Sequence, residues 1–203
     1  NANRGSISYT PGSIKNNISN SLSIEETIFD NCYGYENTNS RCFRIHCNHS
    51  ITFSRNIIRN NIGPTNNSVN GMISLFGQSA IVIDQCQFIN NHQDGVECGG
   101  NGLWLNSGNE GAGLINIYYI QCVFQDNYNA VEGGAIQQAK NTNKKDSLRN
   151  CNLYILGCTF INNTAKKQGG AIAISTFKPV IIDDCAFKGN HATESHAGAI
   201  YIY

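Results

Sequence analysis

The amino-acid sequence predicts an all-β protein: a right-handed, single-stranded parallel β-helix of about six coils of roughly 32 residues each. Three observations support this prediction. One motif recurs along the 203-residue chain, and each copy contains three short stretches in which apolar residues alternate with other residues. Such alternation is typical of strands. No stretch keeps the 3.6-residue period of a helix, and repeats of this length are typical of solenoids.

The first stretch of each repeat is a short apolar alternation, as at Ile81 and Ile83. The second begins only three residues later, at Cys86 and Phe88, where the apolar residues have moved from odd to even positions. Because side chains alternate between the two faces of a strand, this change of phase predicts a corner between two separate strands.

The second stretch has the pattern Cys-x-Phe-x-x-Asn. Its intact copies begin at Cys86, Cys122, Cys158 and Cys185, and degenerate copies begin at Thr27 and Asn56. We expect the four cysteines to form an inward-facing ladder, either as free thiols or as disulfides. The asparagines that end these copies are Asn91, Asn127, Asn163 and Asn190. We expect them to adopt the left-handed conformation at a corner and to hydrogen-bond along the stack through their amides.

The third stretch follows a Gly-Gly pair or a single Gly, as in Gly170-Ala-Ile172. Glycine is expected at this corner because a side chain would clash or because φ is positive. The equivalent apolar residues are predicted to be Ile7, Phe43, Ile73, Trp104, Ile136, Ile172 and Ile200. Their spacings average about 32 residues. Residues 1–203 are therefore predicted to be one β-helix segment, which starts and stops at the same point of the repeat and forms part of a longer array or assembly.

Composition narrows the function classes. The chain has 14 basic and 14 acidic residues, which gives no basic face for nucleic acid. No apolar run reaches the roughly 20 residues of a membrane helix. Nine cysteines together with Asn-x-Ser/Thr sequons favour a secretory route to the cell exterior or surface. The predicted glycosylation sites are Asn17, Asn48, Asn66 and Asn162. Five further cysteines are expected at corners or in insertions, where they could form irregular cross-links: Cys32, Cys42, Cys47, Cys98 and Cys151.

The Phe-x-x-Asn and Gly-Gly-Ala-Ile elements, in this order and spacing, resemble the repeats of chlamydial polymorphic outer membrane proteins. The closest copies lie from Cys122 onward. This resemblance implies a parallel β-helix in an adhesin-like surface protein. The partners expected are flanking coils or other copies of the protein stacked end to end, and host or extracellular glycans or surface proteins.

No enzymatic activity and no cofactor are predicted. The acidic pair Asp183-Asp184 is the one candidate for catalysis, and Asp84 occupies the equivalent position two coils or more away. In the stretch from Cys42 to His49, strand alternation places His46 and Cys47 on opposite faces, which disfavours a metal site. Two alternatives remain open: a self-assembling filament or surface-coat subunit, and a carbohydrate-binding or polysaccharide-degrading β-helix. Loops for recognition are expected at Gln93–Asn101, Asn106–Gly113 and Gln138–Asn150.

Overall fold

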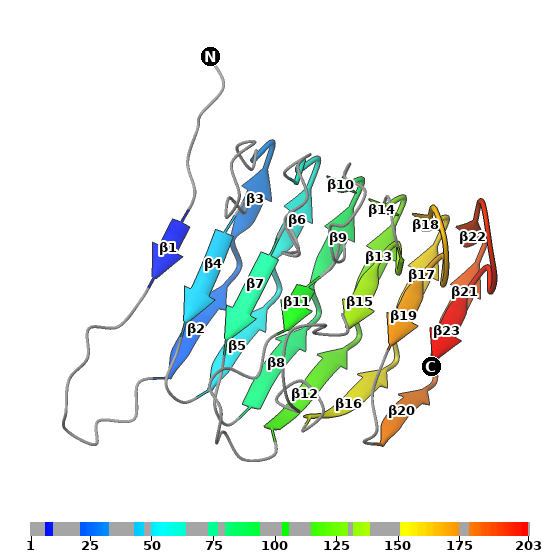
Figure 1. Cartoon of the computed structure of the whole chain (residues 1–203). Helices are drawn as coiled ribbons and strands as arrows, with labels where there is room; N and C mark the ends of the chain where they lie inside the picture. The colour runs from blue at the N-terminus through cyan, green and yellow to red at the C-terminus, as the bar shows by residue number, and fades with distance from the viewer. Residues whose placement is uncertain are drawn as a thin grey trace, which may run out of the picture.

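In the computed structural model, short strands stack side by side along one axis (Figure 1). The structure describes residues 7–9, 21–32, 43–46, 50–63, 73–76, 80–93, 103–105, 115–129, 132–138, 151–174 and 179–202. Every regular element within these ranges is a β-strand, and the strands pair in parallel, each with the strand one repeat away. This arrangement confirms the predicted all-β parallel β-helix. The three loops predicted for recognition lie almost entirely outside the described residues.

Two six-stranded sheets form the longest faces of the stack. Sheet B contains β2 (Leu22–Glu25), β5 (Ile51–Ser54), β8 (Ala80–Asp84), β12 (Ile115–Ile120), β16 (Cys151–Leu156) and β20 (Val180–Asp183). Sheet C contains β3 (Ile28–Asp30), β6 (Ile57–Arg59), β9 (Gln87–Ile89), β13 (Val123–Gln125), β17 (Thr159–Ile161) and β21 (Ala186–Lys188). We call a strand of sheet B and the elements that follow it one coil, so that coil one begins with β2 and coil six with β20.

Three shorter sheets complete the coils. Sheet D contains β10 (His92–Gln93), β14 (Tyr128–Asn129), β18 (Thr164–Ala165) and β22 (His191–Ala192). Sheet A contains β1 (Ile7–Tyr9), β4 (Phe43–His46), β7 (Ile73–Phe76) and β11 (Leu103–Leu105). Sheet E contains β15 (Ile136–Gln138), β19 (Ile172–Ile174) and β23 (Ile200–Ile202). One predicted position was wrong: Leu103, and not Trp104, pairs with Ile73. Because alternation has a period of two, this shift by one residue exchanges the faces of the whole strand.

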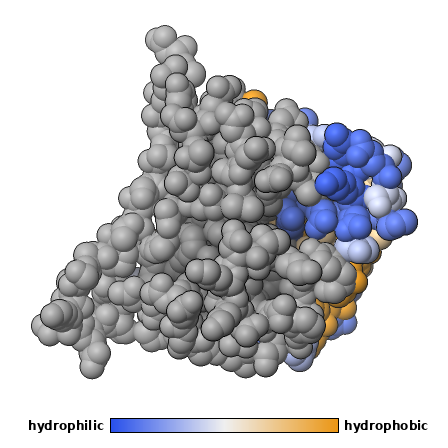
Figure 2. Space-filling model, viewed as in Figure 1, coloured by the Kyte–Doolittle hydropathy of each residue, from blue (hydrophilic) through white to orange (hydrophobic). Residues whose placement is uncertain are grey.

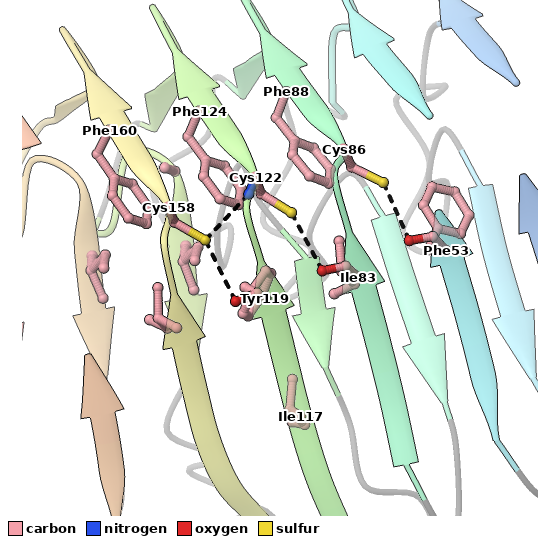
Figure 3. Close-up of a cluster of buried hydrophobic side chains, with 14 of the residues drawn as sticks. Phe53, Ile83, Cys86, Phe88, Ile117, Tyr119, Cys122, Phe124, Cys158 and Phe160 are labelled. Carbon is pink, nitrogen blue, oxygen red and sulfur yellow. Dashed lines mark hydrogen bonds between the residues drawn. The ribbon is translucent and has the colours of Figure 1, made fainter. Parts of the chain in front are cut away.

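The core consists of side chains stacked on their equivalents in the next coil. The phenylalanines of the Cys-x-Phe motif form a continuous column, with ring centroids 4.8 Å apart for Phe88 and Phe124 and 4.9 Å apart for Phe124 and Phe160 (Figure 3). The three rings are nearly parallel and at most 1% exposed. Burying each such ring contributes about 1.5–3 kcal/mol, so the column is a main source of stability.

Corners between the strands have a uniform backbone. The residue just before each Cys or Asn position of the motif has a positive φ, as at Gln85 (φ 51°) and Asn90 (φ 50°). The left-handed residues of the Asn corner in coils three to six are Asn90, Asp126, Asn162 and Gly189. The prediction that Asn91, Asn127, Asn163 and Asn190 adopt this conformation themselves was therefore wrong by one position. The left-handed residue turns the chain, and this turn directs the next side chain into the stack.

Both glycines of the Gly-Gly pair leave no space for a Cβ, and the first also has a left-handed backbone. Gly169 has φ +61°, which an L-residue adopts only with strain, and a Cβ there would lie too close to the Ile172 carbonyl oxygen. Gly170 leaves no space for a Cβ, which would lie 2.6 Å from the His191 carbonyl carbon and too close to the Gly198 carbonyl oxygen. The same holds for Gly133 and Gly134: neither has space for a Cβ, and of the two Gly133 has the positive φ. Both reasons expected from the sequence thus apply to the first glycine, and the steric reason applies to the second.

Candidate functional site

A ladder of buried asparagine amides runs along one corner of the stack. The Asn127 Oδ1 accepts hydrogen bonds from the backbone N–H of Asn91 (3.1 Å) and from the Asn91 Nδ2 (3.0 Å). The Asn127 Nδ2 donates to the Phe88 carbonyl (2.9 Å) and to the Asn163 Oδ1 (2.9 Å). The pattern repeats at Asn61, Asn91, Asn163 and Asn190. Each side chain therefore leans toward the preceding coil and satisfies a backbone donor there.

The cysteine ladder uses the same geometry at the neighbouring corner. The thiols of Cys122 and Cys158 donate to the carbonyls of Ile83 and Tyr119 in the preceding coil, at 3.4 and 3.5 Å (Figure 3). The Cys158 Sγ also accepts the backbone N–H of Cys122 at 3.4 Å. Asn56 occupies this position in coil two, where its Nδ2 donates to the Ile24 carbonyl and its Oδ1 accepts the Thr27 N–H. An amide and a thiol are therefore interchangeable at these corners.

Five of the described cysteines carry thiols that form no disulfide: Cys32, Cys86, Cys122, Cys158 and Cys185. Of the two alternatives for the ladder, the structure contains the thiols and not the disulfides. Cys32 occupies the Asn corner of coil one, which agrees with the predicted corner position, whereas Cys151 begins β16 and lies in a strand. Cys42, Cys47 and Cys98 lie outside the described residues. Hydrogen bonds with the thiols of Cys158 and Cys86, together with burial, raise the pKa of Cys122 above its ordinary value, and burial raises the pKa of Cys185. Both thiols are therefore poor nucleophiles at neutral pH.

Ionic contacts lie on the outer surface of coils one and two. Arg55 contacts the carboxylates of Glu25 (3.1 Å) and Glu26 (3.0 Å), and Arg59 contacts Asp30 (2.9 Å). Hydrogen bonds from Asn60 and Arg59 lower the pKa of Asp30. These exposed pairs contribute little stability, but they neutralise the acidic residues of coil one.

The candidate acidic residues do not come together. Asp84 and Asp183 occupy the same position of sheet B, with Ile120 and Leu156 between them, so they lie three coils apart. At about 4.8 Å per coil, their separation is about 14 Å. Asp184 is the exposed left-handed residue of its corner, with φ 49°. Among the described residues, no group of three or more His, Cys, Asp or Glu side chains could hold a metal ion.

The outer face of sheet B carries a surface that the sequence reasoning missed. From coil three onward its outward positions are largely apolar, and we call this surface the tyrosine face. It comprises Val82, Tyr118, Ile120, Tyr154, Leu156 and Ile181. The rings of Tyr118 and Tyr154 stack at 4.7 Å, and Ile181 is 45% exposed. The signal was present in the sequence, because alternate residues of β12 and β16 are apolar on both faces.

One predicted glycosylation site lies among the described residues. Asn162 is exposed at a left-handed corner, while the next residue, Asn163, is buried in the amide ladder. Asn17, Asn48 and Asn66 lie outside the described residues. No helix in the described part of the chain is long and apolar enough to cross a membrane.

Comparison with known proteins found one family match. Residues 157–175, from the left-handed Gly157 of coil five through Gly170 to one residue past β19, match the Chlamydia polymorphic membrane protein repeat. Searches of curated proteins and of solved structures found no match. The match confirms the resemblance on which the surface-protein prediction rests, and it supports a location at the cell surface. Coil five of this all-strand parallel stack thus contains a repeat of the polymorphic membrane protein type.

Proposed function

We propose that the chain is a segment of an extracellular, adhesin-like surface β-helix that binds partners and performs no catalysis. The observation that carries this proposal is that the buried polar side chains of the two ladders already have hydrogen-bond partners inside the protein. The Asn and Cys side chains of the ladders are engaged with neighbouring coils, so they build a rigid scaffold. The side chains left for a partner lie on the outer surface, where the tyrosine face offers stacked aromatic rings and the exposed Ile181.

The separation of the carboxylates supports a role other than carbohydrate cleavage. Glycosidases place two carboxyl groups about 5–10 Å apart, whereas Asp84 and Asp183 are about 14 Å apart. The positions beside Asp183 and Asp184 in coils four and five hold Ile120, Gln121, Leu156 and Gly157. A second acid within two coils of Asp183 or Asp184 on the N-terminal side would require different residues at these four positions.

A cell-binding assay tests the adhesive role. Beads coated with the chain should adhere to cultured cells, and the double variant Tyr118→Ser/Tyr154→Ser should lose about tenfold in retained beads, because aromatic residues often dominate binding energy. Thr52→Ala, on the same outward row in coil two, is the matched control and should bind as the wild type does. Treating the cells with glycosidase or with protease would show whether glycans or proteins are bound. Equal adhesion of uncoated and coated beads, or release of reducing sugar from added polysaccharides, would contradict the proposal.

Glycosylation is the second testable part of the proposed surface role. Asn162 is exposed, and we expect it to carry a glycan in protein isolated from a source with a secretory pathway. Because Asn163 and Thr164 of the same sequon are buried or partly buried in the folded coil, the glycan should be attached before folding. Mass spectrometry of the native peptide tests this expectation. An unmodified Asn162 in such material would argue against passage through that pathway.

A further inference from the structure

Two acidic side chains border the tyrosine face. They lie in the outward row of sheet B that passes through Ile120 and Leu156, with Asp84 beside Ile120 and Asp183 beside Leu156. Three steps of about 4.8 Å separate the two acids, so they are about 14 Å apart, with apolar side chains between them. All of these side chains point outward from the sheet, at right angles to the stacking axis. Figure 2 shows hydrophobic residues at the lower right of the molecule, where β20 lies in Figure 1.

These two carboxylates lack the ion pairs that the acids of coil one form. Glu25 lies in the same outward row, and Arg55 contacts it at 3.1 Å. Asp84 accepts a hydrogen bond from the Gln85 side chain at 3.5 Å. In the described part of the chain, neither Asp84 nor Asp183 forms an ion pair. The tyrosine face therefore has a negative charge at each end that these residues do not neutralise, and each charge attracts a cation of a partner.

The stacked rings of the tyrosine face expose their edges. Tyr118 and Tyr154 lie face to face along the coil axis, with ring centroids 4.7 Å apart and 13° between the planes. The next outward residues on either side of this pair are Val82 and Ile181. A sugar ring packs its C–H groups on an open, electron-rich aromatic face, and here the rings cover one face of each other. Ring edges between aliphatic side chains instead suit the apolar side chains of a protein partner.

The charges also disfavour two other apolar occupants. A second copy of this face would bring four carboxylates into one interface, and an anionic membrane surface would repel both acids. A helix is better suited, because its backbone groups are hydrogen-bonded within the helix and leave no unpaired donor on an apolar sheet face. Basic residues seven positions apart lie on the same side of a helix, about 10.5 Å apart. Their long side chains can reach two carboxylates at about 14 Å.

We propose that the tyrosine face binds a basic amphipathic α-helix of a protein partner. Apolar residues of the helix pack on Tyr118, Tyr154 and their aliphatic neighbours, and a basic residue at each end of this apolar stripe pairs with Asp84 or Asp183. The inference rests on the proposed surface role and states the chemistry of the partner. It also gives the two acids a role in recognition, in place of the catalytic role that their separation disfavours.

A synthetic helix tests the proposal directly. The probe is a fluorescent peptide of about 20 residues, designed as a helix with leucines on one side and two lysines seven positions apart that flank them. In low-salt anisotropy titrations, Asp84→Asn/Asp183→Asn should bind this peptide about tenfold more weakly than the wild type, and with less dependence on salt. Glu25→Gln, which removes an exposed acid from the same row in coil one, is the matched control and should bind as the wild type does.

A second peptide keeps the test independent of the folding of the variants. With glutamates in place of the two lysines, the peptide should bind the wild-type chain at least about tenfold more weakly. Equal affinities for the two peptides would overturn the proposal, as would equal affinities of the wild type and Asp84→Asn/Asp183→Asn for the lysine peptide. Self-association of the wild type that Tyr118→Ser/Tyr154→Ser abolishes in sedimentation velocity would identify a second copy as the occupant and would also overturn it.

The bead assay separates this inference from the adhesive role. Protease treatment of the cells should abolish adhesion, and Asp84→Asn/Asp183→Asn should reduce it. Adhesion that requires Tyr118 and Tyr154 but is unchanged by loss of the two acids would overturn the basic partner and leave the adhesive role in place. Selective binding of the lysine peptide without adhesion of beads to cells would support the binding site and contradict the adhesive role.

Discussion

Gly170→Ala is expected to destabilise the protein by about 3 kcal/mol or more, the largest effect of any change proposed for this chain. The added Cβ would meet the backbone of coil six, at the Gly198 carbonyl oxygen and at the nitrogen and carbonyl carbon of His191. Backbone atoms cannot move aside as the end of a flexible side chain can. Urea unfolding followed by circular dichroism measures the loss, and a greatly reduced yield of folded protein would have the same meaning.

Gly157→Ala is the matched control for this prediction. Gly157 also has a positive φ of 61°, but its added Cβ would only touch the Gln121 Cγ at 3.5 Å. The equivalent corners carry ordinary residues, including Arg55 and Gln85, at φ values near 50°. We therefore expect a cost of about 1 kcal/mol, from backbone strain alone. Similar losses for Gly157→Ala and Gly170→Ala would show that close packing against coil six does not explain the second glycine.

Asn127→Ala is expected to cost about 3 kcal/mol, the second largest effect. The substitution removes the acceptor of two Asn91 donors, at 3.1 and 3.0 Å, and the donor to the Phe88 carbonyl at 2.9 Å. All these groups are buried, so water cannot replace the lost partner without opening the coil. Asn163→Ala should behave in the same way. Thermal and urea unfolding measure both losses.

Two further variants test whether the lost hydrogen bonds of the amide ladder cause this destabilisation. Asn127→Cys should cost less than Asn127→Ala, because thiols bridge coils at the adjacent corner and Cys32 occupies the Asn position in coil one. Asn152→Ala removes a half-buried amide that donates to the Asn116 Oδ1 on the outer face, and it should change stability by about 0.5 kcal/mol or less. Unchanged unfolding midpoints for both Asn127→Ala and Asn163→Ala would contradict a stabilising amide ladder.

Much of the fold could be predicted because a stacked coil must match its neighbour. The phase change between Ile83 and Cys86 indicated a corner, and the structure places the left-handed Gln85 there. Where the repeat is degenerate, this reasoning was less accurate. In the third strand of coil three, the weak match of Gly102-Leu103-Trp104 to the Gly-Ala-Ile element predicted that Trp104 aligns with Ile73, but pairing with the preceding strand aligns Leu103 with Ile73. Strand register depends on neighbouring hydrogen bonds that a single stretch of sequence does not encode.

The candidate surfaces were harder to predict than the core. The predicted strand pattern used the inward residues of β12 and β16 and assigned no role to the outward ones. The structure aligns Tyr118 with Tyr154 and Ile120 with Leu156 on the outer face. The choice between thiol and disulfide also depended on geometry. In the parallel stack each thiol leans toward a carbonyl of the preceding coil, so the hydrogen bonds of Cys122 and Cys158 go to backbone groups.

The sequence by itself determined the period, the parallel stacking and the identity of the ladder residues, because equivalent positions of successive coils must carry matching side chains. Only the tertiary structure decided which residue of each corner is left-handed, and in which direction the ladder side chains lean. Those two properties arise from the path of the backbone between coils. They give the stack a polarity, because the acceptor side chains of each coil lean toward the coil on its N-terminal side. A repeated motif has the same residues in every coil, so the sequence does not show toward which neighbouring coil the ladder side chains lean.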